Sequence, residues 1–244
     1  MAAVARELSL DLGVLEPLQT ENSVKKQVKE LKNILEEYGH PPLILVGFSW
    51  GAWLSYILTG AHPSLVKKLI LISCGPFEEK YVAQIAQKRL SRLKADENRE
   101  VSSLLSSLNP NSLTGAELAR FGGLMSKSDS YDPLPQGSEE LEFNPDIFRQ
   151  VWGQASRLRS SGELLELGRR IQCPVVAIHG DDDPHPSEGV REPLSRVLRD
   201  FRFIRLKQCG HRPWLERNAK NIFYATMRRE IGLLKEIPPA CDGN

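Results

Sequence analysis

The chain has 244 residues, and its 32 lysines and arginines nearly balance 31 aspartates and glutamates, which gives a formal net charge of +1. This balance argues against nucleic acid as the main partner, because phosphate binding requires a clear surplus or stripe of basic side chains. No apolar run approaches the roughly 18 residues of a membrane span. The charged N-terminus also lacks the apolar core of a secretory signal. We therefore expect no membrane segment and a single core domain, with room for an insertion.

The N-terminal part of the chain predicts two helices with a strand between them. Residues 2–10 have a short helical pattern, and residues 13–19 are apolar enough for a strand. From residue 23 to 38, apolar side chains recur at the spacing of one helix face. A glycine and two adjacent prolines end this second helix.

Two buried strands joined by a helix come next. Residues 43–48 contain a continuous apolar run of the kind found in strands covered on both faces, and residues 67–74 predict a second buried strand. The residues between them predict a helix that ends near His62. Because the connections are short, this unit indicates a parallel sheet with helices on both faces.

Residues 77–165 differ in character from the chain on either side. They are polar, rich in helical patterns and interrupted by proline and glycine, with no run typical of a buried strand. Asn144 followed by Pro145 is typical of a helix start. We interpret the segment as a helical insertion that divides the core domain into two parts, residues 1–76 and 166–244.

The alternation of helices and strands resumes after the insertion. Residues 174–180 predict another buried strand, and residues 201–207 alternate apolar and basic side chains, as a strand nearer the sheet edge does. A last helix is predicted from about residue 213 to 234. With the three strands upstream, the sequence predicts five core strands in an α/β arrangement.

The cysteines and the glycine-rich stretches point to no cofactor. Cys74, Cys173, Cys209 and Cys241 are widely spaced, with no Cys-x-x-Cys pair and no zinc-type cluster. Free thiols in a reducing cytosol are the simplest interpretation, so we expect a cytoplasmic protein. Neither a Walker loop nor a G-x-G-x-x-G motif occurs, and no metal or nucleotide cofactor is predicted.

A G-x-S-x-G motif centred on Ser49 joins the strand at 43–48 to the helix after it. In this context the motif is typical of a nucleophile elbow, a strained turn that presents the serine Oγ at the carboxyl ends of the strands. The turn also directs the backbone N–H of Trp50 toward a developing oxyanion. The alternative is an incidental serine in a glycine-rich turn.

A nucleophilic serine needs a histidine base, and His211 is our candidate. It follows the last predicted strand, on a loop with a glycine before it and a proline shortly after it. His185 is the alternative, because it directly follows an acidic turn. His40 and His62 lie at turns beside prolines, and His179 lies inside a strand.

Three adjacent aspartates compete for the carboxylate that would orient the histidine. Asp183 is our choice, since it is the third residue after Gly180 at the strand end and is fixed by a following proline. Asp182 is the second choice. Asp181 is a candidate for an Asx turn with the local backbone.

With these motifs in this order, the chain resembles the α/β-hydrolase superfamily over nearly its whole length. The resemblance rests on GFSWGAW around Ser49, on CPVVAIHGDDDPHP with Asp183, and on CGHRPW around His211. It implies the α/β-hydrolase fold and a catalytic triad of these three residues. It also implies an oxyanion donor in the backbone N–H of Trp50 and a helical cap at residues 77–165.

The resemblance implies a serine hydrolase that cleaves a small or medium ester, amide or peptide bond. Carbon–carbon hydrolases and non-haem haloperoxidases have the same triad pattern, so the bond type stays open. Phe48, Phe148 and Trp152 are candidates for an apolar substrate pocket, although packing between cap and core explains the last two equally well. Trp53 and Tyr56 are expected in the core.

The N-terminal end departs from the superfamily pattern. Its members usually have about eight strands and an H-G or H-G-G-P motif that supplies a second oxyanion N–H. The chain has neither before Ser49, and losing one donor costs on the order of 10²–10³ in turnover. We therefore expect the N-terminal strands to be truncated, through a start codon assigned too late or a degenerate copy, unless another segment supplies the donor. The alternative function is a non-catalytic pseudo-hydrolase or binding protein.

Overall fold

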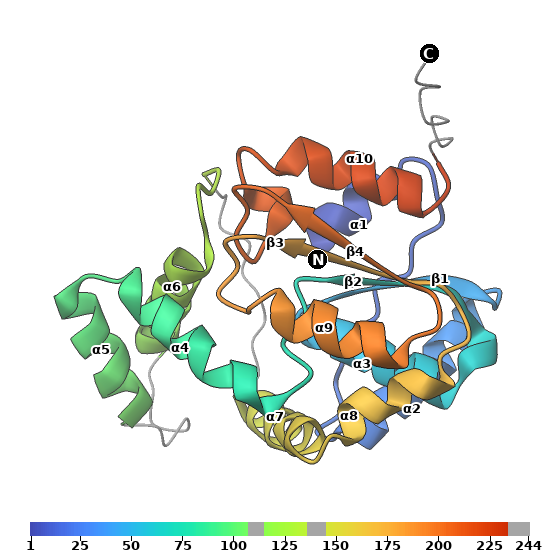
Figure 1. Ribbon diagram of the computed structural model, residues 1–244, viewed down its shortest axis with the longest axis horizontal. Helices are drawn as coiled ribbons and strands as arrows, with labels where there is room; N and C mark the ends of the chain where they lie inside the picture. The colour runs from blue at the N-terminus through green and yellow to red at the C-terminus, as the bar shows by residue number, and fades with distance from the viewer. Residues whose placement is uncertain (107–114, 136–144, 234–244) are drawn as a thin grey trace.

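The computed structural model describes residues 1–106, 115–135 and 145–233, and these residues contain a four-stranded sheet (Figure 1). Its strands lie in chain order and all neighbours are parallel, which confirms the predicted parallel arrangement. They are β1 (Leu43–Phe48), β2 (Val66–Ile72), β3 (Val175–Gly180) and β4 (Phe201–Leu206). The strand with alternating apolar and basic residues, β4, lies at one edge as predicted, and β1 lies at the other.

Helices cover both faces of the sheet, so the molecule has three layers (Figure 1). On one face, Leu69, Leu71 and Ala177 of the strands pack against α2, α3 and α9. On the other face, Ile70 and Ile178 pack against α1 and α10. The bounds of these helices are α1 (Ala2–Leu8), α2 (Val24–Tyr38), α3 (Trp50–Ala61), α9 (Glu188–Val197) and α10 (Lys220–Glu230).

The predicted strand at residues 13–19 is wrong. The segment is irregular and forms no ladder with a strand in the described part of the chain. Pro17 has no N–H to donate, while Leu15 and Leu18 expose 43% and 75% of their surface. An apolar run forms a strand only where a neighbour supplies hydrogen bonds, and this segment instead passes the open side of β1.

The last helix begins later than predicted. Residues Pro213–Leu215 form one 3-10 turn, and α10 begins at Lys220. Between them, the Glu216 carboxylate and the Arg217 N–H both bond to the chain near Asp132. These contacts fix the backbone outside a helix, which a periodic sequence pattern does not indicate.

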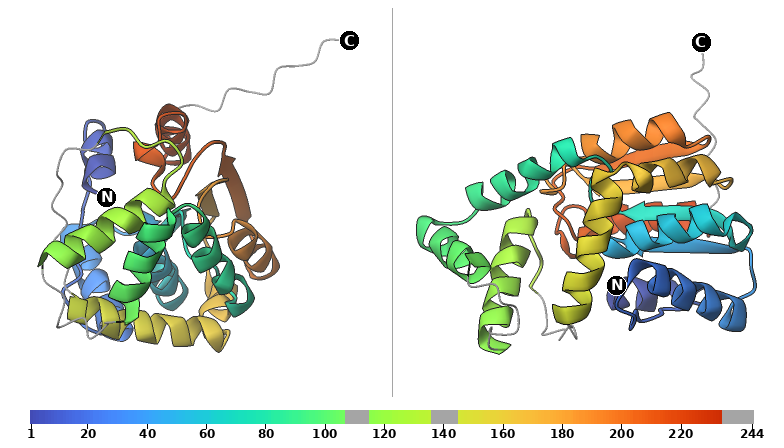
Figure 2. Two further views of the ribbon diagram at one scale, coloured as in Figure 1. Left: turned by 90° about the vertical axis from the view of Figure 1, so that its left-hand side faces the viewer. Right: turned by 90° about the horizontal axis from the view of Figure 1, so that it is seen from below.

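The described part of segment 77–165 consists mainly of helices, and it contains an irregular stretch at residues 130–135 with one isolated bridge from Pro133 to Glu216. Three of its helices lie together beyond the ends of the strands, with a small apolar cluster of their own (Figure 2). These are α4 (Val82–Ser91), α5 (Ala95–Ser106) and α6 (Gly115–Asp129). A fourth helix, α7 (Pro145–Ser160), packs on the layer that contains α2 and α3, and α8 (Glu163–Glu166) follows it. Asn144, the predicted cap of α7, lies outside the described residues.

The core contains the aromatic side chains that the sequence assigned to it. Trp53 and Tyr56 of α3 are almost fully buried, and each donates a hydrogen bond to a backbone carbonyl oxygen. Cys74 and Cys209 are buried free thiols and Cys173 is half-buried, whereas Cys241 lies outside the described residues. In the described ranges, no helix is both long and apolar enough to cross a bilayer.

Candidate active site

Ser49 lies on a strained turn between β1 and α3. Its φ of 52° and ψ of −117° are unusual for a residue with a side chain, and its N–H donates to the carbonyl oxygen of Ile72 at the end of β2. Strand and helix approach so closely that a Cβ on Gly47 would lie 2.3 Å from the carbonyl oxygen of Gly51. The glycine before the serine is therefore required by packing.

His211 lies on the loop after β4, where its ring nitrogen reaches the serine. Its Nε2 is 3.2 Å from the Oγ of Ser49, and the side chain is almost fully buried. The ring also contacts the ring of Phe48, with the centroids 4.9 Å apart. A main-chain bond of 2.8 Å from the His211 N–H to the carbonyl oxygen of Asp129 holds the loop against the end of α6.

Asp183 orients this histidine from the loop after β3. Its Oδ2 lies 2.8 Å from the Nδ1 of His211, and its carboxylate is buried. The N–H of Asp183 donates to Gly180, which closes a tight turn at the end of the strand. Ser49, His211 and Asp183 thus form one chain of hydrogen bonds across the carboxyl ends of β1, β3 and β4.

The other two aspartates of the acidic turn have different partners. Asp181 accepts a hydrogen bond of 3.3 Å from the N–H of Cys209, so it bonds across to another loop rather than to its own turn. Asp182 pairs with Arg92, the residue after the end of α4, at 2.7 Å and lies 3.7 Å from Lys88. Of the three, Asp183 is the one whose carboxylate faces the histidine.

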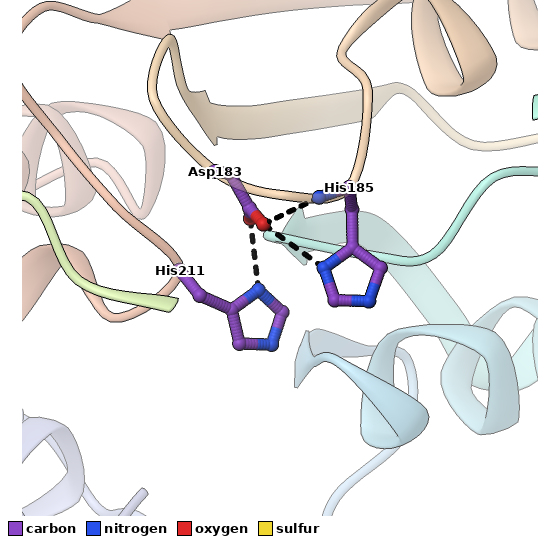
Figure 3. A group of neighbouring side chains, drawn as sticks. All are labelled: Asp183, His185 and His211. Carbon is purple, nitrogen blue, oxygen red and sulfur yellow. Dashed lines mark hydrogen bonds and ion pairs between the residues drawn. The ribbon is translucent and has the colours of Figure 1, made fainter. Parts of the chain in front are cut away.

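His185, the alternative base, is bound to the same carboxylate from the other side (Figure 3). Its Nδ1 lies 2.9 Å from Asp183 Oδ1, and its backbone N–H donates to that oxygen over 2.9 Å. His179, within β3, contacts the backbone carbonyl oxygen of His185 through Nε2. From the sequence, His185 and His211 are alternatives for one role, whereas in the structure one carboxylate contacts both rings. The Asp-Pro-His spacing is the signal that could have suggested it.

The electrostatics of this cluster favour one negative carboxylate beside two neutral rings, those of His179 and His185. Burial by itself would raise the pKa of Asp183, but the adjacent His211, His185 and His179 outweigh it and hold that pKa well below its usual range. Burial lowers the pKa of His179 and of His185 despite the nearby carboxylate. At neutral pH these two rings are therefore uncharged.

The same cluster has the composition of a metal site. One ligand atom each from Asp183, His185 and His211 lie within 4.8 Å of one another, and one carboxylate with two imidazoles is a common zinc-binding set. The hydrogen bonds of 2.8 and 2.9 Å between carboxylate and rings account for this arrangement by themselves. We assign no metal role to the cluster.

Trp50 is the first residue of α3, where backbone N–H groups have no intrahelical acceptor. This N–H is therefore available to an anion next to Ser49. The indole of Trp50 points elsewhere and donates to the Oε1 of Gln27 over 3.0 Å.

The three residues predicted to line a pocket have different surroundings. Phe48 packs against the Trp214 ring and lines a cavity of about 510 Å³ beside β1. Trp152 is 39% exposed and stacks on Trp53, with the centroids 5.8 Å apart. The side chain of Phe148 lies outside the described residues. A larger hollow of about 1400 Å³ lies between α2, α7 and α8 and is not lined by the Ser49 cluster.

The fold and the sequence identify the class of this protein. The chain matches the family model of the alpha/beta hydrolase fold over residues 15–217. It belongs to that family. A comparison with curated proteins finds no match to the sequence.

Solved structures with the same fold come from several kinds of protein. VinJ is 18% identical with a TM-score of 0.62, and the alignment covers 90% of this chain and 75% of VinJ. Proline iminopeptidase of Mycobacterium smegmatis is 13% identical with a TM-score of 0.56, covering 88% and 73%. A serine hydrolase involved in carbazole degradation, the CarC enzyme, is 17% identical with a TM-score of 0.51, covering 91% and 76%. At these identities the comparisons establish the fold.

Proposed function

We propose that the protein is a serine hydrolase that cleaves a small or medium ester, amide or peptide bond through an acyl-enzyme. The observation that carries the proposal is the chain of contacts from Ser49 Oγ to His211 and from His211 to Asp183, at 3.2 and 2.8 Å. Its geometry suits removal of the serine proton by an oriented imidazole.

In the proposed first step, Ser49 attacks the carbonyl carbon of the substrate while His211 Nε2 takes its proton. Asp183 stays ionised because its pKa is far below neutrality, so it stabilises the imidazolium and fixes the ring orientation. The N–H of Trp50 donates to the oxyanion. His211 then protonates the leaving group.

In the second step, a water molecule takes the place of the leaving group. His211 removes a proton from this water, which attacks the acyl carbon. The tetrahedral intermediate again carries its negative charge beside the N–H of Trp50. Its collapse breaks the bond to Ser49 Oγ, releases a carboxylic acid and returns the proton from His211 to the serine.

The helices of residues 77–165 are proposed to act as a cap over this site, between core segments 1–76 and 166–244. Two contacts support this role. Lys88 of α4 donates to the carbonyl oxygen of Asp183 over 3.0 Å, and the end of α6 bonds to the His211 loop. The cap would limit substrate size, and Phe48, Phe148 and Trp152 remain the candidates for apolar contacts with substrate.

Labelling with a fluorophosphonate probe tests the proposal directly. Wild-type protein should be labelled covalently, and Ser49→Ala should not. Ser195→Ala is a matched control, because Ser195 is exposed and its Oγ donates to the carbonyl oxygen of Arg191 within the same helix, α9. If folded wild-type protein shows no Ser49-dependent labelling, the alternative of a non-catalytic binding protein is favoured. If labelling depends on Ser49, hydrolysis rates for nitrophenyl esters and peptide anilides of graded size would show which type of bond the protein cleaves.

A further inference from the structure

His185 makes contacts that the proposed reaction does not use. The residue is 8% exposed, and both its backbone N–H and its Nδ1 lie 2.9 Å from a single oxygen, Oδ1 of Asp183 (Figure 3). The other carboxylate oxygen, Oδ2, faces His211. Two imidazoles therefore lie on opposite oxygens of one buried carboxylate.

We propose that His185 is a positioning residue of the hydrolase, whose Nδ1–H holds the Asp183 carboxylate in the orientation that receives the N–H of His211 and takes up part of its negative charge. This inference rests on the proposed function of Ser49, His211 and Asp183. It assigns to His185 a role through Asp183 and no contact with substrate.

The geometry explains why such a group is useful. The torsion that turns an aspartate carboxylate is soft, so one hydrogen bond to the base does not fix its plane. Two donors from His185 on Oδ1 and one from His211 on Oδ2 define that plane. His179 Nε2 lies 3.5 Å from Oδ2 and contacts the His185 carbonyl oxygen over 2.8 Å. Both contacts stabilise the turn that contains Asp183 and His185.

The tautomer of His185 follows from its partner. An ionised carboxylate accepts only, so the nitrogen that faces Oδ1 carries the proton, and the neutral ring has no proton on Nε2. Burial favours this neutral form. A second positive ring would oppose the imidazolium of His211, since the two ring centroids are only 4.5 Å apart. A neutral donor avoids that cost.

The charged and titratable groups around His185 come from four elements. Asp183 shares its turn, His179 lies on β3, and His211 lies on the loop after β4. Arg89 of α4 also acts on it, and disfavours a positive charge there. Burial, His211 and Arg89 together lower the pKa of His185 and outweigh Asp183, which acts in the opposite direction, so His185 stays neutral while His211 changes charge during turnover.

Two substitutions separate positioning from simple packing. His185→Leu fills the site without a donor, while His185→Asn retains an N–H close to the position of Nδ1. We expect kcat of the leucine variant to fall about 10- to 100-fold with KM nearly unchanged, because one hydrogen bond to a charged group is lost. The asparagine variant should recover most of that loss.

The pH profile gives a readout that packing alone would not move. Without the Nδ1–H donor, more of the Asp183 charge acts on His211, so the imidazolium is favoured. The acidic limb of the kcat/KM profile should therefore move to higher pH in His185→Leu and return toward the wild-type position in His185→Asn. Thermal unfolding of both variants controls for loss of fold.

Proton NMR of the wild-type protein tests the shared carboxylate without any assay of activity. Two downfield imidazole N–H resonances are expected, one lost in His185→Leu and the other in His211→Ala. A single downfield resonance, or unchanged kcat and pH profile in a folded leucine variant with normal Ser49-dependent labelling, would overturn the inference while leaving the hydrolase proposal intact. If wild-type protein showed no Ser49-dependent labelling, the hydrolase proposal itself would be wrong. The two N–H resonances would still show that both imidazoles donate to Asp183.

Discussion

The main-chain N–H of His211 donates to the main-chain carbonyl oxygen of Asp129 over 2.8 Å. This bond joins the loop that carries the proposed base to the last residue of α6, which lies far earlier in the chain. The side chain of Asp129 is itself held by Arg89 of α4, at 2.7 and 2.9 Å. The position of the base is therefore coupled to the helices beyond the sheet.

Gly210→Ala should displace this loop. A Cβ at Gly210 would lie 2.4 Å from the carbonyl oxygen of Asp129 and 2.6 Å from Oε1 of Glu216, so the backbone must move. We expect the free energy of unfolding to fall by about 1–3 kcal/mol and the rate of fluorophosphonate labelling to fall with it. Urea titration and labelling kinetics measure the two effects.

Gly123→Ala is the matched control for that experiment. Gly123 lies exposed on α6, and an added Cβ there meets nothing within 4 Å. Alanine should stabilise this helix by up to about 1 kcal/mol. Equal losses of stability and of labelling rate in Gly210→Ala and Gly123→Ala would show that the close contact between Gly210 and Asp129 does not determine the position of the His211 loop.

Glu216→Ala should destabilise the protein more than its charge alone suggests. The buried carboxylate of Glu216 accepts hydrogen bonds from the N–H groups of Gly210, Tyr131 and Asp132, at 3.1, 3.0 and 2.8 Å. Alanine leaves these donors without an acceptor, so the free energy of unfolding should fall by at least about 2 kcal/mol. The exposed Glu37→Ala should change it by less than about 0.5 kcal/mol.

The three aspartates of the acidic turn should separate cleanly by activity. Asp183→Asn should reduce kcat by roughly 10⁴, because an amide can favour the wrong tautomer of His211. Asp182→Asn weakens a part-exposed pair with Arg92, which is worth at most about 1 kcal/mol, and kcat should change little. Steady-state kinetics of Asp181→Asn, Asp182→Asn and Asp183→Asn measure these effects. The largest loss of kcat in Asp182→Asn would contradict our assignment.

Most of the fold could be predicted from the sequence, because buried parallel strands are continuous apolar runs. The runs at β1, β2 and β3 have this form, and the short turn at Ser49 is recognisable from the glycines that close packing requires. The segment 13–19 contains Val14, Leu15 and Leu18, yet it forms no ladder with a strand in the described part of the chain. Its conformation depends on a tertiary neighbour, which local composition does not reveal.

The candidate site could be predicted in part for a related reason. Ser49, Asp183 and His211 each follow a strand, and parallel strands bring their carboxyl ends to one edge of the sheet. The contact between His185 and Asp183 depends instead on how a turn of a few residues folds back on itself. Nor could the sequence show that Glu216 bonds to three backbone N–H groups, since two of them come from a segment more than 80 positions away.

Acidification should destabilise the protein in two stages, and the sign follows from the lowered pKa values. Unfolded histidine has a pKa of about 6.5, whereas burial lowers the pKa of His179 and His185 in the folded state. Below about pH 6.5 the unfolded chain therefore binds protons that the folded chain does not. Stability then falls, by at most about 1.4 kcal/mol per pH unit for each ring. The contribution of Asp183 is present above about pH 3.9 and is lost as the pH falls through its lower folded value.

Urea unfolding at about pH 7.5, 6.5 and 5.5 measures the first stage. His179→Gln should flatten the pH dependence, because glutamine offers an N–H to the carbonyl oxygen of His185 and does not titrate. His40→Gln is the control, since His40 is exposed and its replacement should leave the slope unchanged. A wild-type protein equally stable at the highest and lowest of these pH values would show that the buried rings titrate alike in both states, against the burial that the structure gives them.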